Sequence, residues 1–240
     1  MLQQNTNGSY PMNNGYAGGQ GGYMVDGHIY PMMNMPVMNR GAETEKVKNI
    51  IQEVYERQKD AIEFHRSMVD MFDFLHLRGF KTWQECRVKE ESDKMQDIQH
   101  LFIKRRQTML GPIKTQHYST VIPPEMYSHT ARDVAHEDIS RETKRILKEY
   151  LKWEESTLEF YKKKMRELME IESYAEYIDI RELIDDTSSE IEFLEEFMVE
   201  LESVGYDSSY IQKVQERFIT EFGEKSHTRG YNRKRARLNY

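Results

Sequence analysis

Cysteine is almost absent from this sequence, because Cys86 is the only one. An internal disulfide framework is therefore excluded. No charged, apolar and small-residue pattern typical of a secretory signal opens the chain, and no uncharged apolar run approaches the roughly 20 residues of a membrane span. These absences predict a soluble, cytoplasmic protein with no membrane role, or one packaged in a virion or other assembly if a virus encodes it.

Familiar catalytic motifs are also missing. The chain has no phosphate-cradling glycine loop, no zinc-ligand spacing and no hydrolase nucleophile elbow. Cys86 has no histidine placed within reach by spacing, so we interpret it as a small apolar core residue and not as a nucleophile. No catalytic residue is predicted.

Proline is scarce, and none of its six copies falls in a stretch with helical periodicity. Residues 1–41 are rich in Gly, Asn, Met and Tyr and almost uncharged, which predicts a flexible arm that becomes ordered only against a partner. Residues 42–223 hold apolar residues at helical spacing and predict one helical domain. Residues 224–240 form a basic tail of net charge +5 in a chain whose net charge is −7.

Two helical hairpins are predicted within residues 42–223. In the first, glycine is expected to close one helix in the left-handed conformation, and a second glycine with a proline is expected to stop the other. The first helix is predicted to run from Thr44 to about Leu77 and to be closed by Gly79. The second is predicted to begin at Phe80 or Lys81, to run to about Met109 and to be stopped by Gly111 and Pro112.

A long connection precedes the second hairpin. Residues 111–130 lack helical periodicity and are too long for a simple turn, so they predict a crossover that runs the length of the bundle. A capping box at the start of the third helix and glycines after the fourth and fifth mark the remaining ends. The third helix is predicted to begin with the capping box Thr130 and Asp133 and to run to about Glu172. The fourth is predicted to begin between Ser173 and Asp179 and to end at Gly205, and a short fifth helix is closed by Gly223.

Several segments between about residues 44 and 222 resemble ferritins. Met68–Phe80, MVDMFDFLHLRGF, resembles the end of a ferritin first helix and its turn. Gln84–Met95, QECRVKEESDKM, is similar to the acidic second-helix motif, in which a Glu is followed three residues later by a His. WEESTLEFY and DDTSSEIEFLEEF resemble segments of the third and fourth helices. The resemblance implies a divergent, all-α ferritin-like protein: an antiparallel four-helix bundle with a long crossover between helices two and three, plus a short fifth helix.

Polar residues occupy positions where the apolar stripes require apolar ones. Carboxylates that face inward from four helices are costly unless a cation lies among them, and iron or manganese is the usual occupant in such bundles. The resemblance gives Glu91 the place of the second-helix Glu, and Glu154 or Glu155 that of a bridging carboxylate. The candidate metal ligands are Glu56, His65, Glu91, Glu154 and Glu190, with Gln58, Glu63 and Asp186 as neighbouring polar positions.

Lys94 stands where the ferritin motif has its His. An ammonium has no lone pair for a metal, and its charge opposes a dication, so we interpret Lys94 as disrupting the site by pairing with Glu91 or Glu154. Asp97 and His100 have the right spacing further along the helix, but they would shift the site and require different partners. The alternative without metal is that some of these acids reach solvent and others pair with a buried base.

Three functions follow from these patterns. The favoured one is a ferritin-like structural or interaction protein with a degenerate metal site and no cofactor, acting in an oligomer or larger assembly. An alternative is an active di-iron or di-manganese protein, either a ferroxidase-type oxidoreductase or a peroxide-detoxifying one. Another is a DNA-associated ferritin-like shell whose basic tail binds phosphates. The candidate nucleic-acid or partner-binding residues are Arg233, Lys234, Arg235 and Arg237.

Aromatic residues are numerous in the helical stretches, and one bundle is not expected to bury all of them. We therefore predict a homo-oligomer in which some of them lie at a subunit interface. The residues concerned are Tyr55, Phe72, Phe74, Trp83, Phe160 and Tyr161.

Overall fold

The computed structural model describes residues 22–25, 28–31, 40–114, 118–128 and 136–223, and the chain divides into two compact units, Met1–Arg40 and Gly41–Tyr240. The first unit contains an antiparallel hairpin of β1 (Gly22–Val25) and β2 (His28–Pro31). The sequence did not predict this hairpin. Each strand has four residues, too few for an alternating pattern to be recognised among the surrounding glycines.

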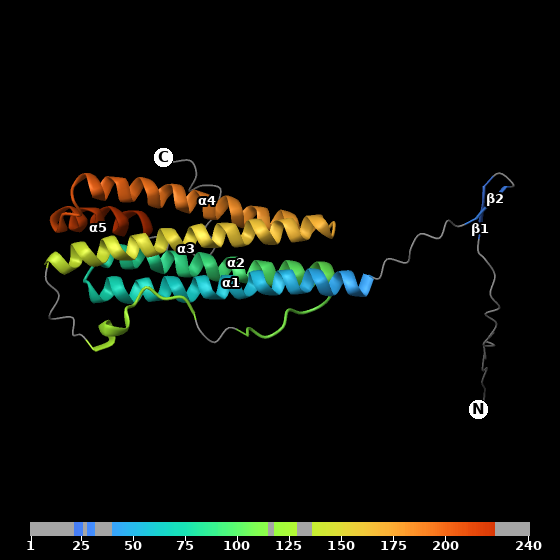
Figure 1. The fold of residues 1–240 in the computed structure, drawn as a ribbon, viewed down its shortest axis with the longest axis horizontal. Helices are drawn as coiled ribbons and strands as arrows, with labels where there is room; N and C mark the ends of the chain where they lie inside the picture. Colours follow the sequence, from blue (N-terminus) through green and yellow to red (C-terminus); the bar gives the residue numbers. More distant parts are fainter. Residues whose placement is uncertain (1–21, 26–27, 32–39, 115–117, 129–135, 224–240) are drawn as a thin grey trace, which may run out of the picture. The chain divides into compact units, whose positions relative to one another are not determined.

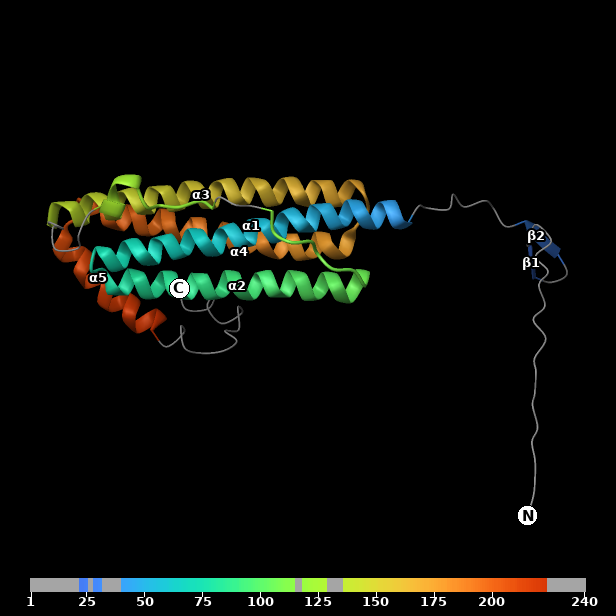
Figure 2. The same cartoon turned by 90° about the horizontal axis from the view of Figure 1, so that it is seen from below.

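The second unit is a helical bundle, with its helices at α1 (Arg40–Phe74), α2 (Arg78–Arg106), α3 (His136–Glu170), α4 (Tyr174–Ser203) and α5 (Ser208–Phe222). Helices α1 to α4 lie side by side, and α5 folds back along the bundle after α4 (Figure 1). The view from below shows the same arrangement and the crossover between α2 and α3 (Figure 2). The predicted all-α bundle with a long crossover and a short fifth helix is therefore confirmed.

The turn between α1 and α2 is closed by His76, whose backbone φ is 59°, and not by Gly79. The Leu77 N–H donates to the Phe72 carbonyl at 2.8 Å, which ends α1. Gly79 lies in the first turn of α2, where an added Cβ would stand 2.3 Å from the Gln215 carbonyl oxygen of α5. The predicted role of Gly79 is wrong, because this glycine permits the close approach of two helix backbones.

Other helix ends lie close to the predicted ones. Helix α2 stops before Gly111 and Pro112, because Gln107 already adopts the left-handed conformation at φ 53°. Gly205, at φ 63°, follows the last turn of α4 as predicted. Two residues thus reverse the chain without the proline or glycine that the sequence suggested, namely His76 and Gln107.

The structure describes the N-terminal cap of α5 but not the predicted cap of α3. The predicted capping box of the third helix, Thr130 with Asp133, lies outside the described residues. Helix α5 has a side-chain cap, because Asp207 Oδ1 accepts a hydrogen bond from the Tyr210 N–H at 3.0 Å. Satisfying one free helix N–H in this way stabilises a helix by about 1 kcal/mol.

Apolar side chains fill the bundle at two levels along its length. The first cluster gathers large aromatic residues near the α1–α2 turn, including Phe72, Phe80, Trp83, Phe197 and Phe218. The second cluster lies toward the other end and includes Val54, Ile98, Phe102, Tyr161 and Leu183. Fully burying one such side chain contributes about 1.5–3 kcal/mol, so the two clusters are the main source of stability. The stretches of α1 to α4 between them are rich in polar residues.

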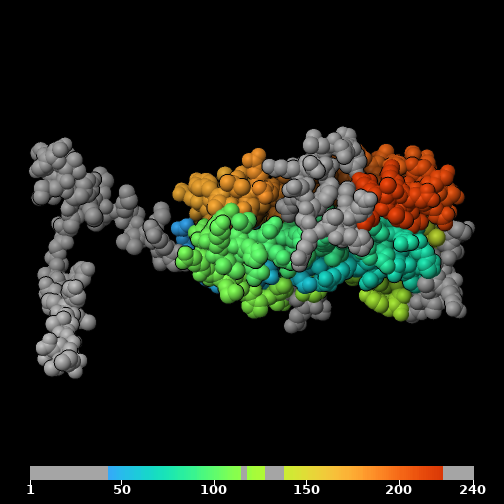
Figure 3. All heavy atoms as spheres, turned by 180° about the vertical axis from the view of Figure 1, so that it is seen from behind, coloured from blue at the N-terminus to red at the C-terminus, as the bar shows by residue number. Residues whose placement is uncertain are grey.

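Helix α5 covers one face of α2. Seen from behind, α5 (red) lies beside the first half of α2 (teal), and the orange part of α4 lies beside the green second half of α2 (Figure 3). Phe218 packs 5.2 Å from both Phe80 and Trp83, measured between ring centroids. The Cys86 thiol, buried beneath α5, lies 3.3 Å from the Phe222 carbonyl oxygen, which agrees with a core role for this cysteine.

Side chains along one stripe of α1 hold the backbone of the crossover. Gln52 accepts a hydrogen bond from the Gly111 N–H at 2.7 Å, and Glu56 accepts one from the Lys114 N–H at 3.3 Å. Asp60 accepts from the Ser119 N–H at 2.7 Å, and Ser67 accepts from the Val121 N–H at 3.0 Å. The crossover therefore runs along α1 before the short 3₁₀ helix η1 (Pro124–Ser128), as its predicted length requires.

The aromatic residues expected at a subunit interface are not all buried within one chain. Phe72, Trp83 and Tyr161 are buried, whereas Tyr55, Phe74 and Phe160 are half-buried. A subunit interface over the half-buried residues stays a prediction. Among the described residues, no helix combines the length and apolar character needed to cross a bilayer.

Candidate functional site

A layer of polar side chains crosses the bundle between the two apolar clusters. We call it the polar layer and define it as Gln58 and His65 of α1, Gln84, Arg87, Glu91 and Lys94 of α2, Glu154 of α3, and Asp186 and Glu190 of α4. The α2 members follow one another at intervals of three or four residues, so they share one helix face. All four long helices therefore contribute to it.

Arg87 is the cation on one side of the polar layer. Its guanidinium nitrogens lie 2.7 Å from Glu90, 3.4 Å from Glu190 and 3.7 Å from Glu91. Tyr150 of α3 donates its hydroxyl to Glu190 Oε1 at 2.7 Å. Glu190 thus lies between a guanidinium and a phenol, and this contact ties α2, α3 and α4 together.

Lys94 is the second cation. Its side chain is 7% exposed, and its ammonium donates to Glu91 Oε1 at 2.6 Å. The same Nζ lies 3.8 Å from Asp186 Oδ2 on α4. Glu91 therefore bridges the two cations, because it contacts both Lys94 and Arg87. Lys94 thus pairs with Glu91, one of the two partners that the sequence suggested.

His65 and Glu154 face each other across the layer. His65 Nδ1 lies 2.8 Å from Gln84 Oε1, and because an amide oxygen only accepts, Nδ1 carries the proton. His65 Nε2 therefore presents a lone pair, and it lies 3.9 Å from Glu154 Oε1. Nε2 has no hydrogen-bond partner among the described residues.

Burial and the two cations set the charge of these groups. Burial, with a further contribution from Arg87, lowers the pKa of His65 to about 3. Burial raises the pKa of Glu154 to about 8, so this carboxyl is protonated at neutral pH. Burial alone would also raise the pKa of Glu91, but Lys94 and Arg87 outweigh it and hold that pKa at about 2. The layer therefore contains a neutral acid and imidazole beside an ionised carboxylate held by two cations.

The structure brings four of the five predicted ligands into this layer: His65, Glu91, Glu154 and Glu190. Glu56 lies outside it, on the stripe that binds the crossover, where its carboxylate also accepts from Gln52 Nε2 at 3.0 Å. The alternative positions Glu155, Asp97 and His100 are exposed. Their helix faces point away from the bundle centre.

The polar layer does not fit a di-iron centre. No three His, Cys, Asp or Glu side chains in the described part of the chain converge as ligands. Lys94 and Arg87 already engage Glu91 and Glu190, and their fixed positive charges oppose a dication at the same oxygens. Glu154 would first have to lose its proton, because a ligating carboxyl must be ionised.

Three residues of the site were not predicted from the sequence: Arg87, Gln84 and Tyr150. The apolar residues Val88 and Met95 of α2 are half-buried beside the inward-facing polar residues. The available signal was the three- and four-residue spacing that continues from Trp83 and Gln84 through the polar residues of α2 to Ile98. Unbroken helical spacing indicated that a charged residue pointed inward.

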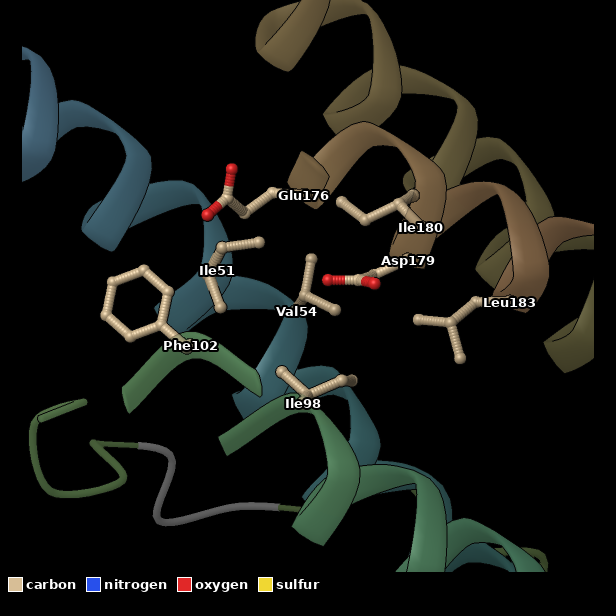
Figure 4. A pocket seen from close by; sticks show the side chains of 8 residues that line it. All are labelled: Ile51, Val54, Ile98, Phe102, Glu176, Asp179, Ile180 and Leu183. Atoms are coloured by element: carbon tan, nitrogen blue, oxygen red, sulfur yellow. The ribbon is translucent and has the colours of Figure 1, made fainter. Parts of the chain in front are cut away.

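A second candidate site lies in the other apolar cluster, where a cavity of about 10 Å³ opens between α1, α2 and α4. Figure 4 shows Ile98, Phe102 and Leu183 around it, with the carboxylates of Glu176 and Asp179 at its border. This volume holds about one water molecule. Both carboxylates are engaged by arginines at the end of α2, so the cavity offers no room or free charge for a substrate.

The two ends of the chain carried further predictions. The basic residues Arg233, Lys234, Arg235 and Arg237 lie outside the described residues, as does most of the predicted N-terminal arm. Nucleic-acid binding by the tail stays a prediction.

No protein-family model and no curated protein sequence matches the chain. Solved ferritin structures do match its fold. An engineered closed form of Archaeoglobus fulgidus ferritin is 14% identical with a TM-score of 0.58, and the match covers 78% of this chain and 98% of that one. Desulfovibrio desulfuricans bacterioferritin is 13% identical with a TM-score of 0.58, covering 73% of this chain and 90% of that one.

The open-pore ferritin of Archaeoglobus fulgidus is 13% identical with a TM-score of 0.59, and the match covers 72% of this chain and 96% of that one. At this level of identity the comparisons establish the fold and not the chemistry. The matches extend over nearly the whole of each ferritin chain, and the two helical hairpins with their long crossover agree with them. The chain therefore has a ferritin-like fold.

Proposed function

We propose that this chain is a ferritin-like structural or interaction protein whose bundle is held by its own cations in place of metal ions, and that it acts in a homo-oligomer or larger assembly. One observation carries the proposal: Lys94 and Arg87 neutralise Glu91 and Glu190 at the centre of the bundle. Removing one partner of such a buried pair is strongly destabilising, so both cations are structural parts of the fold.

Metal-dependent oxidation would require ionised ligands and open coordination positions around a cation. The Desulfovibrio bacterioferritin has a diiron site. In the present chain the polar layer contains ion pairs of Arg87 and Lys94 with carboxylates, a protonated Glu154 and a neutral His65. These features support retention of the fold with a different role for its centre.

Assembly is supported by exposed apolar side chains. Met169 lies in the last turn of α3, and Tyr174 and Ile178 lie in the first two turns of α4; they are 52%, 64% and 55% exposed. Tyr174 and Ile178 are four residues apart, so they share one helix face. Large apolar side chains grouped on a surface are typical of sites that a protein partner covers.

Metal content tests the first half of the proposal. The full chain is purified without chelator, and iron, manganese and zinc are measured by mass spectrometry beside Desulfovibrio bacterioferritin as the positive control. We expect much less than one metal ion per chain and an unchanged melting temperature after EDTA treatment. Near-stoichiometric iron or manganese, or Fe(II) oxidation at the rate of the control, would contradict the proposal.

Molar mass in solution tests the second half. We expect light scattering to give a mass well above the 28.7 kDa of one chain. Ile178→Asp should reduce that mass, because a buried charge in an interface is costly. Val199→Asp is the matched control, since Val199 is 67% exposed on a different part of α4. A monomer at all concentrations tested would reject self-association, and an equal effect of both substitutions would reject this patch as the interface.

A further inference from the structure

Helix α4 is strongly acidic, and Arg181 is its only basic residue. Several of its carboxylates have cationic partners within the bundle, namely Glu176, Asp179, Asp186, Glu190, Glu200 and Glu202. Other carboxylates of α4 are exposed, and no ion pair joins them to another described residue. We call this group the acidic face of α4 and define it as Glu182, Asp185, Glu192, Glu195 and Glu196.

The acidic face lies on the side of α4 that points away from the bundle. Leu183 and Leu194 are buried and mark the inward side. Because successive residues of a helix are about 100° apart, Asp185, Glu192 and Glu196 lie on the side opposite the two leucines. Their exposure shows that no other described element covers this side of the helix. The acidic face is therefore an unpartnered helix face.

We infer that the acidic face is the docking surface for the basic tail of the same chain, residues 224–240. The charges are complementary, because the tail has a net charge of +5. Most of its cations are arginines, whose guanidinium groups bind a carboxylate through two parallel hydrogen bonds. One exposed ion pair is weak, but several pairs made by a tethered segment act together. The cationic residues of the tail are Lys225, Arg229, Arg233, Lys234, Arg235 and Arg237.

Helix α5 brings the start of the tail close to α4. Arg217 Nη1 lies 3.4 Å from Glu200 Oε1, and the ring centroids of Phe218 and Phe197 are 5.3 Å apart. Helix α5 ends about one turn later. The 17 residues after Gly223 can extend over about 56 Å, whereas the 30 residues of α4 span about 45 Å. Every carboxylate of the acidic face is therefore within reach of the tail.

Two features direct the tail to this face and not to the neighbouring surface of α3. The exposed residues of α3 include a row of bases, Lys148, Lys152, Lys163 and Arg166. These bases repel a basic segment within the screening length of about 8–10 Å. In addition, Val199 is 67% exposed one turn beyond Glu196, where it offers an apolar contact to Leu238 or Tyr240 of the tail.

Cross-linking of the full chain tests the contact directly. A carbodiimide joins a lysine ammonium to a carboxylate only where the two groups touch, and mass spectrometry identifies the linked peptides. We expect links from Lys225 or Lys234 to the acidic face at low salt. These links should be lost at about 1 M salt, where the screening length is about 3 Å. An equal mixture of unlabelled and isotope-labelled chains separates links within one chain from links between two chains.

Limited trypsin digestion measures how far the acidic face protects the tail. Glu192→Gln/Glu196→Gln removes two charges from an exposed surface, and we expect cleavage within residues 224–240 to be roughly threefold faster than in the natural chain. Glu149→Gln/Glu170→Gln is the matched control, because it removes the same charge from exposed positions of α3. Melting temperatures equal to that of the natural chain confirm that both variants are folded.

Each outcome decides the inference. Salt-sensitive links within one chain, together with faster cleavage in the α4 variant alone, support it. It is overturned if Lys225 and Lys234 link to no residue of the acidic face, or if the links join only differently labelled chains, which would place the tail on a second copy. Equal cleavage of the two variants also overturns it. Neither measurement depends on metal content or molar mass, so a failure here leaves the proposed function standing.

Discussion

The protonated carboxyl of Glu154 predicts how the stability of the bundle depends on pH. Glu154 is 3% exposed, and burial raises its pKa from 4.5 to about 8 in the folded state. A carboxyl group whose pKa is higher in the folded than in the unfolded chain makes its full contribution to folding stability below its unfolded-state pKa. That contribution is lost as the pH rises toward the folded-state pKa. The Glu154 contribution therefore falls between pH 4.5 and about 8.

His65 works in the opposite direction over part of that range. Its pKa is lowered from 6.5 to about 3 in the folded state, so its contribution is present above pH 6.5 and is lost as the pH falls toward 3. Each effect amounts to about 1.4 kcal/mol per pH unit. The two cancel between pH 4.5 and 6.5. Only Glu154 acts between pH 6.5 and 8, where we expect the free energy of unfolding to fall by about 2 kcal/mol.

Urea denaturation across this window provides the assay. The natural chain and Glu154→Gln, which mimics the protonated carboxyl, are unfolded at several pH values from 6 to 9. The natural chain should lose about 2 kcal/mol, and the variant should stay nearly flat. Parallel curves for the two proteins would refute the reasoning, because the slope would then belong to other groups. Below pH 4.5 both should lose stability, since Glu91 and His65 become protonated in the unfolded chain first.

Three further predictions concern contacts that hold the bundle. Arg87→Met should lower the free energy of unfolding by about 3 kcal/mol, because it leaves the mostly covered Glu190 carboxylate without its cation. Adding Glu190→Gln should restore part of the loss in urea denaturation, and no recovery in the double variant would contradict this role of the pair. Gly79→Ala should displace α5, because the new Cβ would lie 2.3 Å from the α5 backbone. A change in tryptophan fluorescence would report the displacement, and an unchanged spectrum and melting temperature would contradict the prediction. Ser67→Ala should lower the free energy of unfolding by about 1–3 kcal/mol and speed hydrogen exchange at the Val121 amide, because this amide loses its acceptor. Equal exchange rates in the variant and the natural chain would show that other contacts hold the crossover.

The helices and their connections could be predicted from the sequence because they depend on short-range patterns. Apolar residues recur at three- and four-residue spacing through α1 to α5, and the proline-containing stretch between α2 and α3 interrupts them. The turn residues were harder to predict. His76 and Gln107 adopt left-handed backbone conformations that are uncommon for residues other than glycine, so the prediction favoured the nearby glycines.

The candidate site was predictable in part. An acid or a histidine at an inward position can be recognised from one helix alone, which is how Glu91, Glu154 and His65 were found. Arg87 was missed because a long basic side chain on a helix usually reaches solvent. Glu56 was misplaced because its position in α1 is close to the inward face, and only the path of the crossover gave its carboxylate a partner on the other side.

The sequence by itself determined that the chain forms a helical bundle, where its hairpins turn, and that polar residues interrupt its apolar stripes. Only the tertiary structure decided which charged side chains pair with each other and which helices come into contact. The contact of Lys94 with Asp186, that of Arg87 with Glu190 and the approach of α5 to Gly79 join residues far apart in the chain. The physical reason is that helical periodicity is a local property, whereas an ion pair between helices depends on how each helix is rotated and packed against its neighbours.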